Sequence, residues 1–325
     1  MTVDLPTSDA ATRLFTILSP ELLDRQAKLR SGEVFLAHYT SAENALNIIN
    51  GQQFWLRNVR CMNDYSEVRH GIELLLRVFH ADDDLRRNRL YSLFDKVVEG
   101  AAKQAVDTFD TWLPSLPHGA YIGCLSEFDP DDDQGRLSMW RAYGKHGSSV
   151  ALVMNSEPFV AETDVLKAYS LPVLYLTDAE FTDRIDKALE RIEKEIESFR
   201  GLDSAAIQHI IFYWLLFLSL GLKHRGFREE VEWRIVYFPD LERSPTIAEE
   251  VETIGGIPQI VQKIPLEDSP ERGLHGASVS KLVERVLIGP TEYPLVLFDA
   301  FEKALRDRGA ANAAEHIKLS DIPLR

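Results

Sequence analysis

Two carboxylates and a guanidinium recur at every second position near residue 230. Glu230, Glu232 and Arg234 alternate with apolar residues, and alternate residues of a β-strand project from one face. If that face borders a cleft, the three charged groups can form a catalytic site in which the carboxylates contact a substrate. If it borders solvent, they form an ordinary polar strand surface. The sequence leaves both interpretations open.

A histidine and a tyrosine lie where a predicted strand meets a predicted helix. The apolar residues before His38 predict a strand over residues 34–38, and Thr40 or Ser41 can cap a helix over residues 41–50. His38 and Tyr39 therefore stand at a junction where proteins often place reactive groups. A histidine at a strand end is also a common hydrogen-bonded core residue, so the junction alone predicts no particular reaction.

A second aromatic pair and a glycine turn follow later in the chain. Trp140 and Tyr143 lie three residues apart in a predicted short helix over residues 137–144, so they share one face. They can pack in the core or face a ligand. Gly144 and Gly147 bracket a tight turn whose N–H groups can bind an anion, although glycines in turns commonly serve the backbone alone.

The remaining polar motifs have a structural explanation of their own. Asn63, Asp64 and Glu67 stand at the start of a predicted helix that runs toward residue 80, where such residues cap the helix and favour its positive end. The acidic loop over residues 127–135 lacks the ligand spacing of a calcium-binding EF-hand. We therefore predict a solvated loop there and no metal.

The composition is that of a folded globular protein without a basic surface. The chain has 325 residues, 45% of them hydrophobic, and a net charge of −15 at pH 7, which argues against binding nucleic acid through overall charge. Cys61 and Cys124 form no Cys-x-x-Cys pair. The first ten residues lack the parts of a secretory signal, and the apolar run 210–222 is shorter than the roughly 20 residues that span a membrane. We expect a cytoplasmic protein with no membrane partner.

The periodicities predict an α+β fold in a single domain, residues 1–325. Residues 1–32 are predicted as an N-terminal helical extension, and residues 178–224 as a helical insertion or cap whose second helix is apolar nearly all round. Beyond the junction strand, strands are expected over residues 54–56, 120–126, 149–154, 165–176, 227–238, 257–264, 282–288 and 316–319, and further helices over residues 85–112 and 293–308.

The motifs resemble those of one family. In chain order they are His38-Tyr39-Thr40, Asn63-Asp64 with Glu67, Cys124-Leu125-Ser126-Glu127, Met139-Trp140 with Tyr143 and Gly147, Glu232-x-Arg234, and Val286-Leu287-Ile288-Gly289-Pro290. This order resembles a prokaryotic family catalogued as domain of unknown function two-nine-seven-one, over roughly residues 35–290. The family name carries no activity with it.

A looser resemblance does imply an activity. A strand ending in His-Tyr-Thr, a following helix, a later aromatic residue and a late glutamate on a strand are similar to the ADP-ribosyltransferase fold in its His-Tyr-Glu version. The resemblance implies a split, mainly antiparallel sheet with a cleft for NAD, as substrate, between its halves. No metal is implied.

The same resemblance implies roles for the candidate residues. His38 would hydrogen-bond the ribose of NAD, Tyr143 or Tyr39 would stack on the nicotinamide, and Glu232 or Glu230 would bind the ribose 2′-hydroxyl. The rest of the cofactor-binding set would be Thr40, Trp140, Gly147 and Arg234, and the residues left to bind an acceptor or cap a helix are Asn63, Asp64 and Glu67.

The chemistry of that reaction suits these residue types. Breaking the nicotinamide–ribose bond develops an oxocarbenium-like cation, which a nearby carboxylate stabilises while an aromatic face holds the departing ring. The first hypothesis is therefore an ADP-ribosyltransferase-like or NAD-cleaving enzyme, such as a bacterial toxin or phage-defence effector, with an unidentified acceptor.

Two other classes of function remain. The second hypothesis is a non-catalytic nucleotide-binding or sensor module that keeps a cleft for an NAD-like small molecule. The third is a metal-dependent nucleotide hydrolase that uses Asp64, Glu67 and His38. We rank it below the other two because no compact metal-ligand spacing is present.

Overall fold

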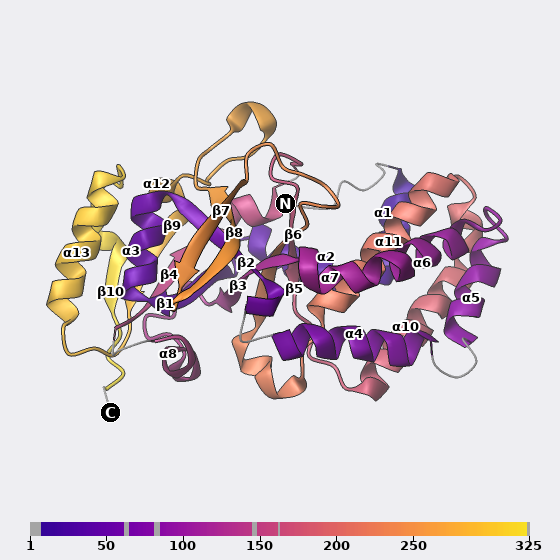
Figure 1. Cartoon of the computed structure of the whole chain (residues 1–325), viewed down its shortest axis with the longest axis horizontal. Helices are drawn as coiled ribbons and strands as arrows, with labels where there is room; N and C mark the ends of the chain where they lie inside the picture. The colour runs from indigo at the N-terminus through magenta and orange to yellow at the C-terminus, as the bar shows by residue number, and fades with distance from the viewer. Residues whose placement is uncertain (1–7, 62–64, 81–84, 145–147, 162, 324–325) are drawn as a thin grey trace.

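The structure of the protein, a computed structural model, describes residues 8–61, 65–80, 85–144, 148–161 and 163–323. Along the longest axis, a β-sheet with its covering helices occupies one end and a bundle of helices the other (Figure 1). The candidate residues of the sequence lie mainly on the sheet and beside it. The fold is described below as far as it positions them.

The sheet is mainly antiparallel. Within the described residues, ten strands form one sheet in the order β10-β9-β4-β1-β3-β2-β8-β7, and β6 and β5 are added beside β3. Among these described strands, only the pair β9 and β10 is parallel. The strands are β1 Phe35–Ser41, β2 Gln53–Asn58, β3 Tyr121–Phe128, β4 Ser149–Met154, β5 Ala168–Pro172, β6 Glu232–Tyr237, β7 Ala248–Ile254, β8 Ile257–Pro265, β9 Val283–Ile288 and β10 Ile317–Leu319. The predicted α+β class with a mainly antiparallel sheet is confirmed.

The sheet forks at β3. One edge of β3 pairs with β6 from Tyr121 to Ser126. The opposite edge pairs with β2 at residues 121–122 and with β1 at residues 126–128. Residues 123–125 of that edge lie in neither register, so β1 and β2 diverge from β3 and lead two separate wings of the sheet. The fork leaves an opening inside the fold.

The wing that contains β1 and β4 is covered on both faces. Alternate residues of a strand point to opposite faces, and accordingly Leu36 belongs to the main core while Ala37 and Tyr39 belong to a smaller second core. Helices α3 (Ala42–Gly51) and α13 (Pro294–Asp307) pack on the main-core side, and α8 (Leu137–Tyr143) contributes Met139 and Trp140 to the second core.

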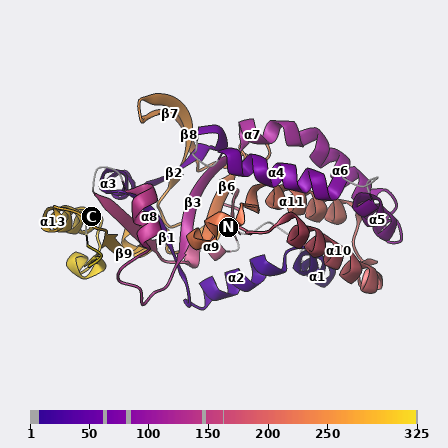
Figure 2. The same cartoon turned by 90° about the horizontal axis from the view of Figure 1, so that it is seen from below.

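The helical end of the molecule is built from three separated segments of the chain. Figure 2 shows α11 between a layer that contains α4 and α6 and a layer that contains α1 and α10. The helices are α1 Asp9–Leu18, α2 Pro20–Arg30, α4 Tyr65–His80, α5 Leu85–Phe94, α6 Ala101–Trp112, α10 Asp178–Lys194 and α11 Ser204–Gly221. Residues 178–224 therefore pack together with helices from before and after the first strands. Their description as an insertion or cap stays a prediction.

Helix α11 is the centre of this bundle. By length and composition it could cross a membrane, and it is longer than the apolar run 210–222 considered in the sequence. However, 67% of the helix is buried inside the fold. Trp214, Leu216 and Leu220 are fully buried among the helices around it. The predicted need to cover an almost wholly apolar helix is thus met by packing within the chain.

Short helical segments join these elements. The α-helical ones are α7 Leu116–Gly119, α9 Glu157–Val160 and α12 Val279–Leu282, and the 3-10 segments are η1 Val59–Cys61, η2 Leu113–Ser115, η3 Ile196–Phe199, η4 Arg225–Glu230, η5 Pro270–Arg272 and η6 Ala313–His316. Segment η4 matters most for function, because it leads directly into β6.

Two predicted strand boundaries are wrong at the places that position the candidate site. Strand β1 continues past His38 to Ser41 because Tyr39, Thr40 and Ser41 all pair with β4, so His38 lies inside the strand and not at its end. Ser41 then caps α3 by accepting a hydrogen bond from Asn44 N, as predicted.

The predicted strand over residues 227–238 begins only at Glu232. Residues 225–230 form η4, and Val231 has a left-handed backbone with φ of 41°. The extended conformation therefore begins only after Val231. Glu230 and Val231 therefore do not belong to the strand faces to which alternation assigned them. All six residues of β6 are buried, so its charged face meets the protein interior and not solvent.

Other boundaries differ for local reasons. The strand predicted over residues 165–176 is only β5, since Lys167 has a left-handed backbone and Pro172 has no N–H to extend the ladder. The helix predicted over residues 85–112 is broken between α5 and α6. Strand β7 was missed because its burial pattern is almost continuously exposed and offers no alternation of buried and exposed positions.

Candidate functional site

A cavity of about 290 Å³ lies at the fork of the sheet. Six of the predicted site residues line it: His38, Tyr39, Thr40, Tyr143, Glu230 and Glu232. They come from β1, α8, the end of η4 and the start of β6, which are far apart in the sequence. The opening between the two wings lets side chains from both faces of β1 reach one cavity.

His38 is held by a backbone carbonyl at the fork. Its Nδ1 lies 2.9 Å from the carbonyl oxygen of Cys124, and since a carbonyl can only accept, Nδ1 carries the proton and Nε2 is left as an acceptor. Burial lowers the pKa of His38 below its ordinary value, against the weaker raising effect of this hydrogen bond. The ring is therefore neutral at neutral pH.

The ring of His38 also packs edge-on against Phe54 of β2. The ring centroids are 5.1 Å apart with an interplanar angle of 76°. Phe54 in turn lies against Gly123 of β3, where an added Cβ would come within 2.5 Å of Phe54 Cε1. Gly123 is needed for this close approach, and the imidazole orientation depends on it.

Glu232 is buried and fully ion-paired. Its Oε1 lies 2.8 Å from Arg234 Nε, and its Oε2 lies 3.0 Å from Lys223 Nζ. Burial alone would raise the pKa of Glu232, but the charges of Arg234 and Lys223 outweigh it and lower the pKa to about 2. The side chain is only 3% exposed, so Glu232 is a permanent carboxylate at the back of the cavity.

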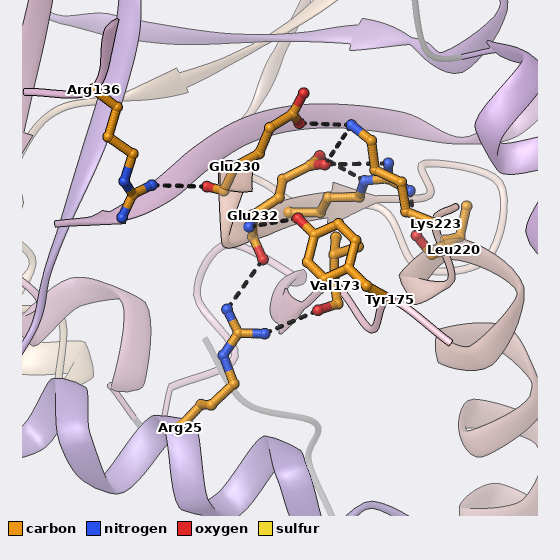
Figure 3. A network of polar contacts seen from close by, with 9 residues as sticks. Arg25, Arg136, Val173, Tyr175, Leu220, Lys223, Glu230 and Glu232 are labelled. Carbon is orange, nitrogen blue, oxygen red and sulfur yellow. Dashed lines mark hydrogen bonds and ion pairs between the residues drawn. The ribbon is translucent and has the colours of Figure 1, made fainter. Parts of the chain in front are cut away.

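Glu230 is the more accessible of the two carboxylates. Its side chain is 17% exposed and its Oε2 lies 2.7 Å from Lys223 Nζ. Lys223, whose side chain is fully buried, thus bridges Glu230 and Glu232, as Figure 3 shows. The left-handed Val231 between them is rare for a β-branched residue. This turn lets two glutamates from a helical segment and a strand meet one ammonium group.

Two arginines from opposite sides hold the backbone of this pair (Figure 3). Arg25 of α2 donates to the carbonyl oxygen of Glu232 at 3.4 Å and to that of Val173 at 2.9 Å, and it also pairs with Glu127. Arg136 donates to the carbonyl oxygen of Glu230 at 3.1 Å. Helix α2 near the N-terminus therefore takes part in positioning the site.

Some of the remaining predicted binding residues line the cavity wall, and others only support the residues that do. Tyr143 is half-buried on the cavity wall. Tyr39 also borders the cavity, but its ring packs against Trp140 at 4.8 Å between centroids, so it is poorly placed to stack on a ligand. Thr40 accepts a hydrogen bond from Asn44 Nδ2 at 3.1 Å.

Trp140 and Arg234 do not line the cavity. Trp140 is buried and donates from Nε1 to the carbonyl oxygen of Gln134, with Gly289 leaving room for its ring. Arg234 is fully buried and donates to the carbonyl oxygen of Leu220 as well as to Glu232. In this geometry both side chains support wall residues, and neither reaches a ligand directly.

Some predicted residues lie outside the described part of the chain. These are Asn63, Asp64 and Gly147; the backbone of Glu67 belongs to α4, but its side chain is not described. Their predicted roles stay predictions. Among the described residues, no group of three or more histidine, cysteine, aspartate or glutamate side chains is placed to hold a metal ion.

Sequence reasoning missed several wall and support residues. Arg57 and Trp55 of β2 and Asn44 and Asn47 of α3 line the cavity, and Lys223 stands behind it. The signal for Lys223 was a charged residue directly after the apolar run of α11. For Arg57 it was the alternation of β2, in which Trp55 and Arg57 occupy the less buried positions.

Fold and site define an α+β protein with a cavity, lined by both apolar and charged side chains, at the fork of a mainly antiparallel sheet. A family model described as "Protein of unknown function (DUF2971)" matches residues 139–235, which confirms the predicted resemblance to this family in that stretch. The matched stretch contains Tyr143, Glu230, Glu232 and Arg234 but not His38. No curated protein and no solved structure matches the chain.

Proposed function

We propose that the cavity binds the nicotinamide–ribose part of NAD, or of a close analogue, and that the protein cleaves the bond between them in the manner of an ADP-ribosyltransferase. One observation carries this proposal: His38, Tyr143, Glu230 and Glu232 line one cavity at the opening between two wings of the sheet. A split sheet with a histidine, an aromatic residue and a carboxylate at the split is what the His-Tyr-Glu resemblance implies.

Each wall residue has a role in this proposal. Nε2 of His38 accepts a hydrogen bond from a ribose hydroxyl, since Nδ1 is engaged by Cys124. Tyr143 provides the face for the nicotinamide ring, because Tyr39 is packed against Trp140. Glu230 contacts the ribose 2′-hydroxyl, because Glu232 is too deeply paired to do so.

The chemistry balances without a further reagent. The bond between ribose C1′ and the pyridinium nitrogen breaks, and its electron pair goes to that nitrogen, so nicotinamide leaves as a neutral molecule. The ribosyl cation is stabilised by the carboxylates until water or an acceptor attacks C1′ and loses a proton. Neutral His38 adds no positive charge beside that cation.

The cavity volume limits what is enclosed. Ligand pockets commonly measure about 300–1,000 Å³, and the volume of about 290 Å³ here suits one nucleoside-sized group. We infer that the nicotinamide riboside half is enclosed while the rest of the dinucleotide extends outward.

A second candidate function is supported by the charges behind the cavity. Lys223 and Arg234 together balance the charges of Glu230 and Glu232, which weakens the stabilisation of a developing cation. A protein that binds a nucleotide in this cavity without turnover, as a sensor module, would have no need of uncompensated carboxylates.

Nicotinamide release from NAD decides between the two. The wild-type chain is incubated with NAD, and nicotinamide is quantified by chromatography beside Glu230→Gln and His38→Ala. Removal of one group that stabilises transition-state charge commonly costs about 10²–10³-fold in turnover, so both variants are expected to lose release. The exposed neighbour Glu229 supplies the matched control Glu229→Gln, which should keep it. NAD binding without release in the wild type contradicts the enzyme and supports the sensor.

A further inference from the structure

Arg57 is a cation on the cavity wall without a carboxylate partner among the described residues. Its Nε donates to the side-chain oxygen of Gln259 at 2.9 Å, and its Nη2 donates to the carbonyl oxygen of Cys61 at 2.6 Å. Both acceptors are neutral, and Nη1 makes no hydrogen bond to a described residue. In a chain with a net charge of −15, an arginine in this state is unusual.

The other charged groups around the cavity are balanced within the described residues. Lys223 and Arg234 compensate Glu230 and Glu232. On the β2 side, Lys263 lies 4.6 Å above the ring of Trp55, but it is paired with Glu250 and Glu252. Arg57 is therefore the surplus charge of the wall, and it favours an anionic ligand.

The position of Arg57 indicates where on the cavity wall an anionic group would bind. Arg57 stands on β2, across the fork from His38 on β1, at the last position that β2 pairs with β8 and one residue before the strand ends at Asn58. Burial lowers the pKa of Arg57 from its ordinary value, which reflects a guanidinium partly removed from water without a compensating anion. An anion bound there would supply that compensation.

We propose that Arg57 binds a phosphate group of the ligand, so that the cavity selects phosphorylated nucleotides over the corresponding nucleosides. A guanidinium held at Nε and Nη2 by neutral acceptors is fixed in orientation and keeps Nη1 for a phosphate oxygen. This inference deepens the proposed function by assigning the phosphate end of the ligand to the β2 wing, but it requires only binding and no turnover.

The test compares ligands that differ in one phosphate. Titration calorimetry on the full chain uses nicotinamide mononucleotide, nicotinamide riboside and sodium pyrophosphate, the last as a bare anion. The wild type should bind the mononucleotide at least about tenfold more tightly than the riboside, as expected for one charge-assisted phosphate contact. Arg57→Gln should remove this preference and the binding of pyrophosphate.

Two variants keep the result interpretable. Arg60, three residues further along and exposed, supplies the control Arg60→Gln, which should retain the preference. If Arg57→Gln does not fold, as judged by its thermal unfolding, Arg57→Lys keeps the positive charge and should retain part of the preference. Equal affinities of the wild type for mononucleotide and riboside overturn the inference, as does an unchanged preference in Arg57→Gln or no binding of any phosphate probe.

The outcome is separable from that of the proposed function. Phosphate-dependent binding that requires Arg57, without release of nicotinamide from NAD, supports this inference and contradicts the enzyme. Release of nicotinamide with a KM for NAD that Arg57→Gln leaves unchanged supports the enzyme and overturns the role of Arg57.

Discussion

The imidazole of His38 donates a hydrogen bond to the backbone carbonyl of Cys124, 2.9 Å away, on the edge of β3 that neither wing of the sheet covers. The side chain of the same cysteine hydrogen-bonds the carboxylate of Glu232. One residue at the fork thus connects the candidate histidine with the buried carboxylate, and both groups are fixed before any ligand binds.

The pKa of His38 predicts a pH dependence of stability. The unfolded chain takes up this proton near the ordinary pKa of about 6.5, but burial lowers the pKa in the folded state. The unfolded state therefore binds more protons below about pH 6.5, and the free energy of unfolding falls as the pH falls through that range. Urea unfolding at pH 7.5 and 5.5 should show a smaller loss for His38→Gln than for the wild type.

An exposed histidine provides the comparison. His275 is exposed at the surface, and His275→Gln should keep the wild-type loss of stability between the two pH values. Equal pH dependences of wild type and His38→Gln would show that the ring is not held neutral by the fold.

Breaking the buried ion-pair network should be costly. Lys223→Met leaves Glu230 without its ammonium partner and Glu232 with Arg234 alone. Loss of one member of a buried ion pair commonly costs about 3–5 kcal/mol, so we expect the free energy of unfolding to drop by about that amount. Chemical denaturation measures it.

A surface lysine separates burial from charge in this experiment. Lys303 pairs with Asp307 on the exposed face of α13, where such pairs contribute about 0–1 kcal/mol. Lys303→Met is therefore expected to stay within about 0.5 kcal/mol of the wild type. A similarly small effect of Lys223→Met would be incompatible with a buried network.

Close packing at the fork predicts that substitution by alanine lowers stability at one glycine and not at another. Gly123→Ala places a Cβ within 2.5 Å of Phe54 Cε1, so Phe54 must move and the packing against His38 changes. Overpacking of this kind commonly costs about 1–3 kcal/mol. Gly51→Ala, at the end of α3, meets nothing within 4 Å and should leave the melting temperature unchanged or raise it. The idea fails if both variants melt alike.

The sequence predicted the individual strands and helices better than it predicted which of them lie side by side. Alternation and helical spacing located β1, β3, β4 and β9, because each buries apolar residues at regular intervals. They also identified His38, Tyr143, Glu230 and Glu232, which prove to line one cavity. Which of them share a cavity depends on pairing across the fork, and local spacing carries no information on that.

The errors have equally local causes. Residues 227–231 were predicted as part of the strand that contains β6, but the helical turn of η4 and the left-handed Val231 depend on contacts from distant parts of the chain, such as Arg136 to Glu230. Lys223 and Arg57 were missed because a single charged residue beside an apolar run looks like an ordinary end of an element. Their significance lies in what they pair with, or do not pair with, in three dimensions.

The assignment of the ring-stacking residue predicts different kinetic effects for two tyrosines. Tyr143 is half-buried on the cavity wall, whereas Tyr39 packs against Trp140 and its hydroxyl accepts a hydrogen bond from Arg136 N at 3.3 Å. In the proposed NAD-cleaving reaction, Tyr143→Phe keeps the aromatic face and should retain most activity. Tyr143→Ala should raise KM for NAD about tenfold, since base–aromatic stacking contributes about 1–3 kcal/mol.

Tyr39→Phe removes only the hydroxyl that meets Arg136. It should lower the melting temperature slightly and leave KM unchanged, because the ring itself keeps its place in the second core. Steady-state kinetics of nicotinamide release, with thermal unfolding of the same samples, measures both quantities. A KM effect in Tyr39→Phe together with none in Tyr143→Ala would reverse the assignment and place the nicotinamide against Tyr39.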